Sequence, residues 1–201
     1  VGRDDGKERG EYAPLMFRAA RFELADWGTL WLSEQPAVAG SKSWDAALPR
    51  IATWCKLRDR LRGNGLLLVL NTHFDHKGEK ARLESARLIS KWLGEHSAEL
   101  PVVVTGDFNC DDDSGPYQAL VAQTATPALR DAYRAVHPAR NEHEASFHAF
   151  QGNEVGTRID WILPSQHFAA KSATIDRTNR QGRYPSDHFP VTAELVYAPT
   201  K

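Results

Sequence analysis

The sequence lacks most of the short motifs that assign an enzyme class directly. It has only two cysteines, Cys55 and Cys110, and neither has companions at the spacing of a zinc site. We expect both to be free thiols, since Cys55 lies in a tryptophan-rich segment typical of a buried strand. There is also no glycine-rich phosphate loop and no serine nucleophile elbow. A covalent mechanism is therefore unsupported, and an activated water is the expected nucleophile.

Long apolar runs and an excess of one charge are also absent. No stretch approaches the roughly 20 apolar residues of a membrane span, and the polar start, Val1–Arg9, is not a signal peptide. We expect no membrane insertion, and the sequence indicates no compartment. The 25 Lys and Arg nearly cancel the 26 Asp and Glu. The chain thus lacks the global positive field that draws proteins onto nucleic acids.

Length and patterning predict a single domain over residues 1–201, of the α/β class. Of the 201 residues, 41% are apolar, enough for one substantial core. Strands fit the pattern better than helices, so a layered sandwich is expected. The segment 1–14 and the Gly, Ser and Pro-rich segment 33–49 are expected to be loops. The expected strands are two short ones within Pro14–Leu32, then Ile51–Leu57, Leu66–Asn71, Pro101–Thr105, Ser146–Phe150, Arg158–Leu163, Ala173–Asp176 and Phe189–Tyr197, and the expected helices are Glu79–His96, Ser114–Gln123 and Leu129–Val136.

Short polar clusters stand at the ends of several of these strands. Each follows or precedes a run of apolar residues, so the fold can bring them to one edge of a packed sheet. Pro101–Thr105 is a continuous apolar run, typical of a strand buried on both faces. The clusters are Asn71-Thr72-His73, Gly106-Asp107-Phe108-Asn109, Arg158-Ile159-Asp160 and Ser186-Asp187-His188.

Asp107 and Asn109 are spaced so that both side chains leave the strand on the same side. Phe108 between them then points inward. A carboxylate and an amide in one pocket can orient a water or support a hard cation. Alternatively, Asp107 only caps the turn that follows, because Asp and Asn are ordinary turn residues.

Asp187 and His188 precede the last strand and point in different directions. Asp187 suits a metal ion, and His188 suits a phosphate oxygen or the proton of a water. The alternative is a surface turn with an incidental histidine. Asp160 lies among apolar neighbours, where a carboxylate needs a partner. That partner is either His188, whose tautomer Asp160 would fix, or the neighbouring Arg158 in a purely structural pair.

His73 stands two residues after the end of the expected strand Leu66–Asn71 and is a candidate site residue. His76, three residues further on, is a weaker candidate. A histidine at a strand end is often only a hydrogen-bonded structural residue, so this alternative stays open. Together the clusters supply acids, bases and oxygen ligands without a covalent nucleophile. That combination indicates hydrolysis of a phosphoester by activated water.

The four clusters, in this order, resemble the endonuclease/exonuclease/phosphatase superfamily, which has the DNase I-like fold. The resemblance covers nearly the whole chain and implies a four-layer α/β/β/α sandwich. It further implies hydrolysis of phosphoesters with Mg²⁺ or Mn²⁺. The substrate would be a small molecule or a nucleic acid, and no obligate protein partner is implied. By this resemblance the metal ligands are Asp187, Asp107 and Asn109, and the catalytic residues are His73, Asp107, Asn109, Asp160, His188 and Glu11.

The resemblance also assigns a role to each residue. Asp107 and Asn109 would orient the attacking water and the transition state. His188, backed by Asp160, would act as a base or contact the phosphate, and His73 would stabilise the charged phosphoryl group. Glu11 stands where DNase I-like members have a carboxylate that orients this second histidine.

The chain departs from the family pattern at its start. Members open with a strand carrying an Asn and, further on, a Gln-Glu whose Glu is a principal metal ligand, and neither is found here. On this resemblance roughly 50 to 60 residues, about two strand-helix units, are missing before Val1, which would leave the sandwich incomplete at its N-terminus. The alternative function is therefore a non-catalytic or inactive binding domain of the same fold.

Overall fold

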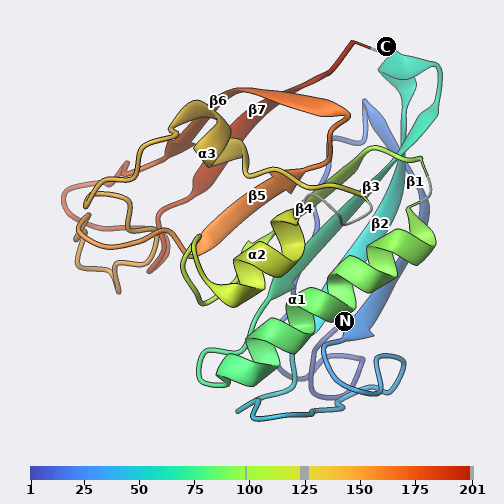
Figure 1. Cartoon of the computed structure of the whole chain (residues 1–201), viewed down its shortest axis with the longest axis horizontal. Coiled ribbons are helices and arrows are strands. Elements are labelled where there is room, and N and C mark those ends of the chain that lie inside the picture. Colours follow the sequence, from blue (N-terminus) through green and yellow to red (C-terminus); the bar gives the residue numbers. More distant parts are fainter. Residues whose placement is uncertain (98, 123–126, 200–201) are drawn as a thin grey trace.

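The computed structural model describes residues 1–97, 99–122 and 127–199 and shows a mixed α/β fold (Figure 1). The strands are β1 (Phe22–Trp31), β2 (Ile51–Asp59), β3 (Gly65–His73), β4 (Val102–Asp107), β5 (Asp160–Pro164), β6 (Phe168–Ile175) and β7 (Val191–Tyr197). The helices are α1 (Glu79–His96), α2 (Gly115–Val121) and α3 (Ala132–Val136), with a short 3₁₀ turn at Arg60–Arg62. The class expected from the sequence is confirmed.

A five-stranded sheet in the order β1-β2-β3-β4-β5 forms the centre of the structure. β2 and β3 are antiparallel, and the turn between them has positive φ at Gly63 (59°) and Asn64 (63°). β3 and β4 are parallel, which requires a long connection, and α1 supplies it. β5 then returns antiparallel to β4. The polar ends of β3 and β4 and the start of β5 therefore meet at one edge.

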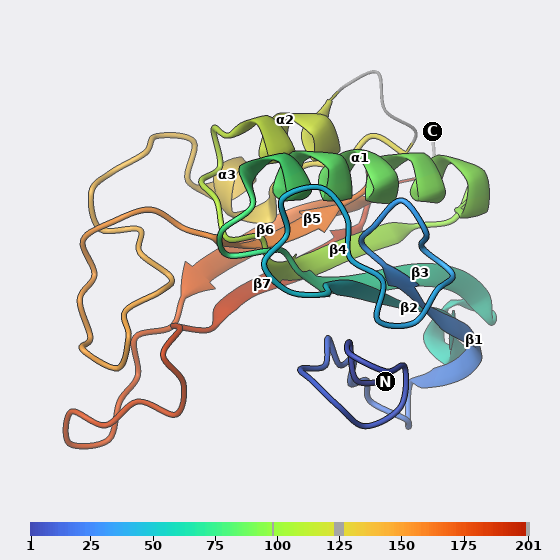
Figure 2. The ribbon, with the colours of Figure 1, turned by 90° about the horizontal axis from the view of Figure 1, so that it is seen from below.

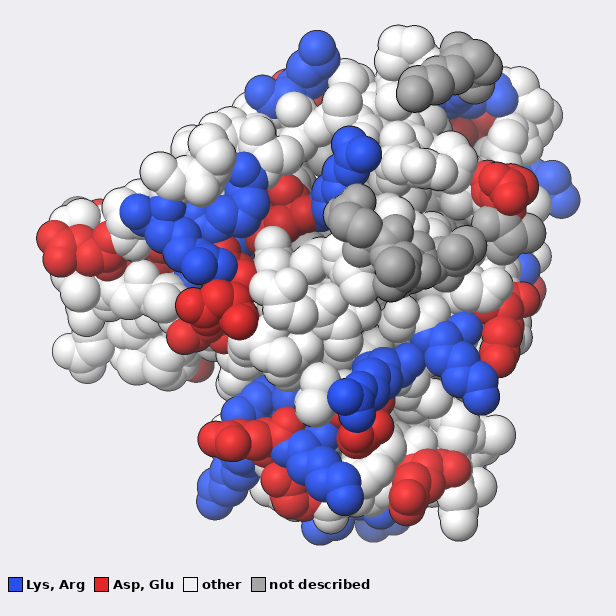
Figure 3. All heavy atoms as spheres, viewed as in Figure 1, with Lys and Arg blue, Asp and Glu red and all other residues white. Residues whose placement is uncertain are grey.

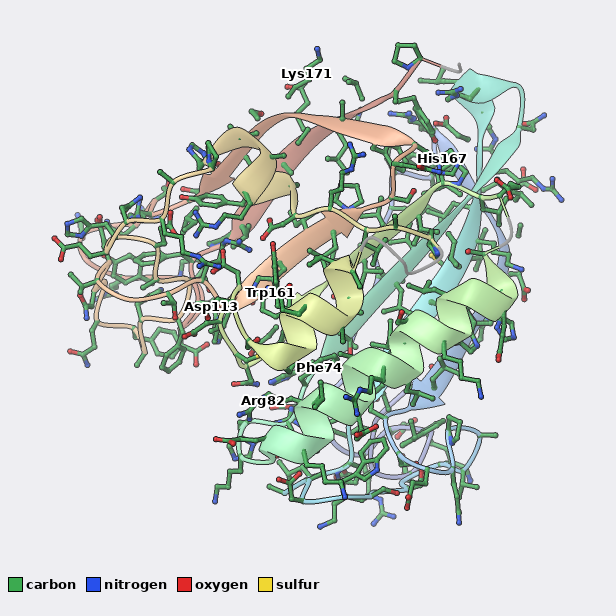
Figure 4. All side chains as sticks on the ribbon, viewed as in Figure 1. Phe74, Arg82, Asp113, Trp161, His167 and Lys171 are labelled. Carbon is green, nitrogen blue, oxygen red and sulfur yellow. The ribbon has the colours of Figure 1, made fainter. Side chains whose placement is uncertain are left out.

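Helices α1 and α2 cover one face of this sheet, as Figure 2 shows from the side. Apolar residues recur at helical spacing along α1, and Ala86, Ile89 and Leu93 are buried against the sheet. In Figure 4, Trp161 of β5 and Phe74 lie beneath the helices, and both are fully buried. No helix in the described part of the chain is both long and apolar enough to cross a membrane.

A second, two-stranded antiparallel sheet consists of β6 and β7. Helix α3 packs on it through Tyr133, which lies in one apolar cluster with Ala173, Ile175 and Phe189. In Figure 2 the helices α1, α2 and α3 all lie above the strands, on the same side. The described residues therefore combine two sheets with helices that lie on one side of them.

Several expected elements differ in detail. Pro14–Leu32 contains one strand, β1, in place of two short ones, because its backbone pairs continuously with β2 apart from one bulge. Ser146–Phe150 is not a strand, since only Phe147 makes a bridge, to His188. β4 is fully buried on one face only, where Val102 and Val104 lie under the helices. Helix α2 ends at Val121, and the last residue of the expected helix, Gln123, lies outside the described residues.

A cluster of buried charges joins β5 to the loops before it. The guanidinium of Arg158, fully buried, donates to Asp131 (2.5 Å) and Asp112 (3.3 Å). Arg134 lies between Asp112 and Glu144 and pairs with both. A second Arg158 nitrogen donates to the backbone oxygen of Asp160 (3.0 Å). Because the carboxylates are buried, this cluster fixes the start of β5 only while both signs of charge are present.

Replacing Arg158 tests how much stability this cluster supplies. In Arg158→Met the carboxylates of Asp131 and Asp112 lose a buried partner, so we expect a loss of about 3–5 kcal/mol in the free energy of unfolding. Urea titration followed by tryptophan fluorescence measures the loss.

The matched control is Arg87→Met, which removes an exposed pair with Glu84 on α1 (2.8 Å). An exposed pair contributes little, so a change below about 1 kcal/mol is expected. If the free energy of unfolding falls by the same small amount in both variants, the buried cluster does not stabilise the fold.

Candidate active site

Strand register brings three of the predicted site residues side by side. His73 of β3 is opposite Asp107 of β4, and Asp107 is opposite Asp160 of β5. Gly106 allows this close approach, because a Cβ there would lie 2.2 Å from the backbone oxygen of Thr72. The expectation that strand ends deliver these side chains to one edge is confirmed.

The carboxylate of Asp160 pairs with His188, whereas Arg158 bonds only to the backbone oxygen of Asp160. His188 Nδ1 lies 2.8 Å from Asp160 Oδ2, so that nitrogen donates its proton to the carboxylate. The other ring nitrogen, Nε2, then lies 3.8 Å from Asp107 Oδ2. Since the Arg158 side chain bonds to Asp131 and Asp112, the purely structural pair expected as an alternative is wrong.

His73 connects Asp107 to Glu11. Its Nε2 lies 3.3 Å from Asp107 Oδ2, and its Nδ1 lies 3.6 Å from Glu11 Oε2. Glu11 also pairs with Arg3 and, at 3.4 Å, with Arg50. A segment without regular structure is thereby held by ion pairs next to the histidine, which is the position that the sequence predicted for this carboxylate.

The turn after β4 is anchored by Phe108, which points into the core as expected. Its ring stacks on Trp161 (4.2 Å between centroids) and meets Phe74 edge-on (4.9 Å). The backbone N–H of Asn109 donates to Asp107 Oδ1 (2.9 Å), so Asp107 does cap the turn. Its other oxygen still faces the histidines, so the capping bond does not exclude the second role expected for Asp107.

Asn109 and Asp187 lie at the border of this group. Asn109 has φ 51° and donates its side-chain N–H to the Phe74 oxygen (3.0 Å), which leaves the side-chain oxygen to offer to a ligand. Asp187 lies next to His188, and its backbone oxygen accepts from His148 and Ala149 (2.9 and 3.1 Å). Its carboxylate raises the pKa of His188. However, it is not part of the group that Asp107, Asp160 and His188 form within 4.8 Å.

The site shifts the pKa values of Asp107, His73 and His188. Burial and the charge of Asp160 raise the pKa of Asp107 to about 6. Burial and the charge of Arg50 lower the pKa of His73 to about 4. Burial also lowers the pKa of His188, but the hydrogen bond and charge of Asp160 outweigh it, so the net shift is upward. At neutral pH, His73 is neutral and His188 is partly cationic.

Oxygen donors dominate the group, which suits a hard divalent cation. Ligand atoms of Asp107, Asp160 and His188 lie within 4.8 Å of one another, the one such group found among the described residues. Asp107 is held close to a like charge, and a cation would relieve that repulsion. The donor set therefore fits Mg²⁺ or Mn²⁺ better than a soft metal.

A cavity of about 370 Å³ opens over these groups. Its walls include His73, Asp107, Asn109 and His188, together with Glu11 and Arg50. Sequence reasoning missed Arg50, which is almost fully buried and bonds to His76 Nδ1 at 3.0 Å. No local motif marks it, because it becomes part of the site only through β2–β3 pairing. His76, the weaker histidine candidate, lines the same cavity and bonds to this arginine.

Comparison with known proteins identifies the class. The model of the endonuclease/exonuclease/phosphatase family matches residues 22–188, and the chain belongs to this family. Members of the family act on phosphoesters. No curated protein sequence matches the chain.

Solved structures agree with this assignment. A mannosyl-6-phosphatase from Bacteroides thetaiotaomicron is 37% identical with a TM-score of 0.85, over 98% of this chain and 75% of that one. A family member from Bacteroides vulgatus gives the same identity, TM-score and coverage. The human nocturnin catalytic domain, 17% identical with a TM-score of 0.68 over 90% of this chain and 62% of that one, shows the shared fold alone.

The opposite pKa shifts of the two histidines can be measured directly. In NMR titrations with a chelator present, we expect His73 to titrate near pH 4 and His188 above its usual value of about 6.5. In Asp160→Asn the pKa of His188 should fall, because the carboxylate that stabilises the cation is gone.

The control is Asp113→Asn, which removes an exposed carboxylate. This variant should leave both titrations unchanged. Equal titration of the two histidines near pH 6.5 would contradict the geometry described here.

Proposed function

We propose that the chain hydrolyses phosphoesters with Mg²⁺ or Mn²⁺ and that its substrates are phosphomonoesters of small sugars. The observation that carries the proposal is the contact of His73 and His188 with one carboxylate, Asp107, beside a second, Asp160. Such a group combines a general base with hydrogen-bond donors for a phosphoryl group. The mannosyl-6-phosphatase relative supports the choice of substrate.

His188 is proposed as the general base. Asp160 holds the proton on Nδ1, so that Nε2 is the atom that accepts a proton from water. Asp107 and Asn109 position this water, because the Asp107 oxygen and the base converge on the same space. The raised pKa makes the neutral form of His188 a stronger proton acceptor, which is available at pH values above that pKa.

His73 is proposed to bind the phosphoryl oxygens as a neutral donor. With a pKa near 4 the ring is neutral at pH 7 and carries one N–H, which must be on Nε2 to face the phosphoryl group; Nδ1 then does not donate to Glu11, whose carboxylate pairs with Arg3 and Arg50. The metal ligands are proposed to be Asp107 and Asn109, which line the cavity and offer oxygens that suit Mg²⁺ or Mn²⁺, with Asp187 as a third ligand from outside the group that Asp107, Asp160 and His188 form within 4.8 Å. A divalent ion, when bound, supplies positive charge to the phosphoryl group and acidifies water.

A small substrate suits the site better than duplex DNA. The cavity of about 370 Å³ is at the small end of ligand pockets, which span roughly 300–1,000 Å³. The formal net charge is −1, and on the face covered by α1 and α2, drawn in Figure 3, groups of Lys and Arg lie beside Asp and Glu. Tight binding along a phosphate backbone needs an excess of positive charge.

The non-catalytic alternative is not favoured. A binding domain does not require a hydrogen-bonded Asp-His pair directed at a second carboxylate. Each of these groups is half-buried at a cost in desolvation, which a catalytic role explains.

Hydrolysis assays test the proposal. With Mg²⁺ or Mn²⁺ we expect the purified protein to release phosphate from mannose 6-phosphate. His188→Ala and Asp107→Ala should each lower kcat by about 100-fold to 10,000-fold, because the base or its water is lost. The control His143→Ala changes an exposed histidine outside the cavity.

Two outcomes would contradict the assignment. Activity that survives both substitutions would show that the site lies elsewhere. Faster hydrolysis of bis-p-nitrophenyl phosphate or plasmid DNA than of any sugar phosphate would show that the substrate is a diester.

Removing metal gives a separate prediction. EDTA should abolish hydrolysis, and Mg²⁺ or Mn²⁺ should restore it, since phosphoryl charge otherwise goes unneutralised. Full activity after exhaustive chelation, checked by elemental analysis, would show that the side chains act without a metal ion.

A further inference from the structure

Phe147 is a half-exposed aromatic residue at the edge of the candidate site. Its side chain lines the same cavity as His73, Asp107 and His188, and 48% of its surface is accessible. Scattered exposed apolar residues are normal, so exposure alone carries no function. The way in which the structure holds this ring is what distinguishes it.

Both sequence neighbours of Phe147 are buried and bonded. Ser146, fully buried, accepts the backbone N–H groups of Ile159 (2.9 Å) and Asp160 (3.2 Å) on its hydroxyl. On the other side, the backbone N–H of His148 donates to the oxygen of Asp187. Phe147 is thus fixed between two anchored residues and is turned outward, toward the cavity.

The ring is also set against a catalytic group. Phe147 forms a backbone bridge with His188, and their ring centroids lie 5.1 Å apart at 60°. One edge of the ring therefore supports the imidazole, and the remaining surface faces the cavity. Such a preorganised apolar surface loses little conformational entropy when a ligand packs on it.

The cavity has a mixed lining. Phe147, Ile159 and Leu48 are apolar, whereas Arg50, His76 and Glu11 carry hydrogen-bonding groups. A sugar ring has a similar division, with C–H groups on one face and hydroxyls around its edge. A monosaccharide can place its phosphate at His73 and His188 while its ring packs on Phe147.

We propose that Phe147 is the platform on which the sugar ring of the substrate packs through its C–H face. The inference rests on the proposed sugar phosphatase function and names the residue that selects the leaving group. A phosphoester without a ring gains nothing from this surface. Phe147 therefore controls specificity and not the chemical step.

The kinetic test compares a substrate that has a ring with one that lacks it. For Phe147→Ala, the ratio of kcat/KM for mannose 6-phosphate to that for glycerol phosphate should fall about five- to tenfold, the scale of one aromatic contact, because any loss of support for His188 affects both substrates equally. Phe147→Trp should retain the preference. The matched control is Phe150→Ala, an exposed phenylalanine of the same loop that does not line the cavity.

Three kinetic results would overturn the proposal. Equal losses with both substrates would show that Phe147 only supports His188. No loss with either would show that nothing packs on the ring. A selective loss with nucleoside monophosphates would show that the platform takes a base.

Binding provides a readout that does not depend on turnover. With a chelator present, saturation-transfer NMR should show contact between protein aromatic protons and the C–H protons of mannose 6-phosphate. The signal should fall at least about fivefold in Phe147→Ala and persist in Phe150→Ala. If the wild type hydrolyses neither substrate, the proposed function fails, but the NMR measurement still tests whether a sugar packs on Phe147. A signal that is undetectable in the wild type, or unchanged in Phe147→Ala, overturns that proposal.

Discussion

Two carboxylates placed opposite each other on neighbouring strands govern the structure around the site. Asp107 and Asp160 face across the β4–β5 pair, where like charges repel. Neighbouring groups offset that repulsion. His188 donates a hydrogen bond to one oxygen of Asp160. One oxygen of Asp107 lies near His73, and its second oxygen accepts the backbone N–H of Asn109. Burial and this repulsion raise the pKa of Asp107 to about 6, the kind of shift that is common at active sites.

The supporting structure is correspondingly rigid. Beneath the turn, Phe108 lies on Trp161, so that Asp107 and Asn109 cannot move apart without opening the core. Beside it, the buried Arg158 cluster fixes the backbone at Asp160. Apolar packing and buried ion pairs thus hold neighbouring parts of one site, and each takes its residues from segments distant in sequence.

The sequence predicted the parts of the site that depend on local pattern. The α1 boundaries follow from apolar spacing, and the inward Phe108 follows from alternation along a strand. The sequence could not predict partners that are distant along the chain. No local pattern distinguishes an Arg158–Asp131 pair from an Arg158–Asp160 pair. Likewise, no local pattern identifies Arg50 and Phe147 as residues that line the cavity. Ser146–Phe150 alternates like a strand, but its backbone bonds go to Asp187 and Phe189, so it forms a wall of the site.

The parallel pairing of β3 with β4 has a consequence for how the chain acquires its site. His73 and Asp107 become neighbours only after α1 has crossed over the sheet and docked, and Asp160 and His188 arrive from still further along the chain. Closing such loops costs entropy before any contact repays it, so these contacts form late in folding. A partly folded chain therefore contains every reactive side chain but no site, and catalytic competence and the native topology must appear together.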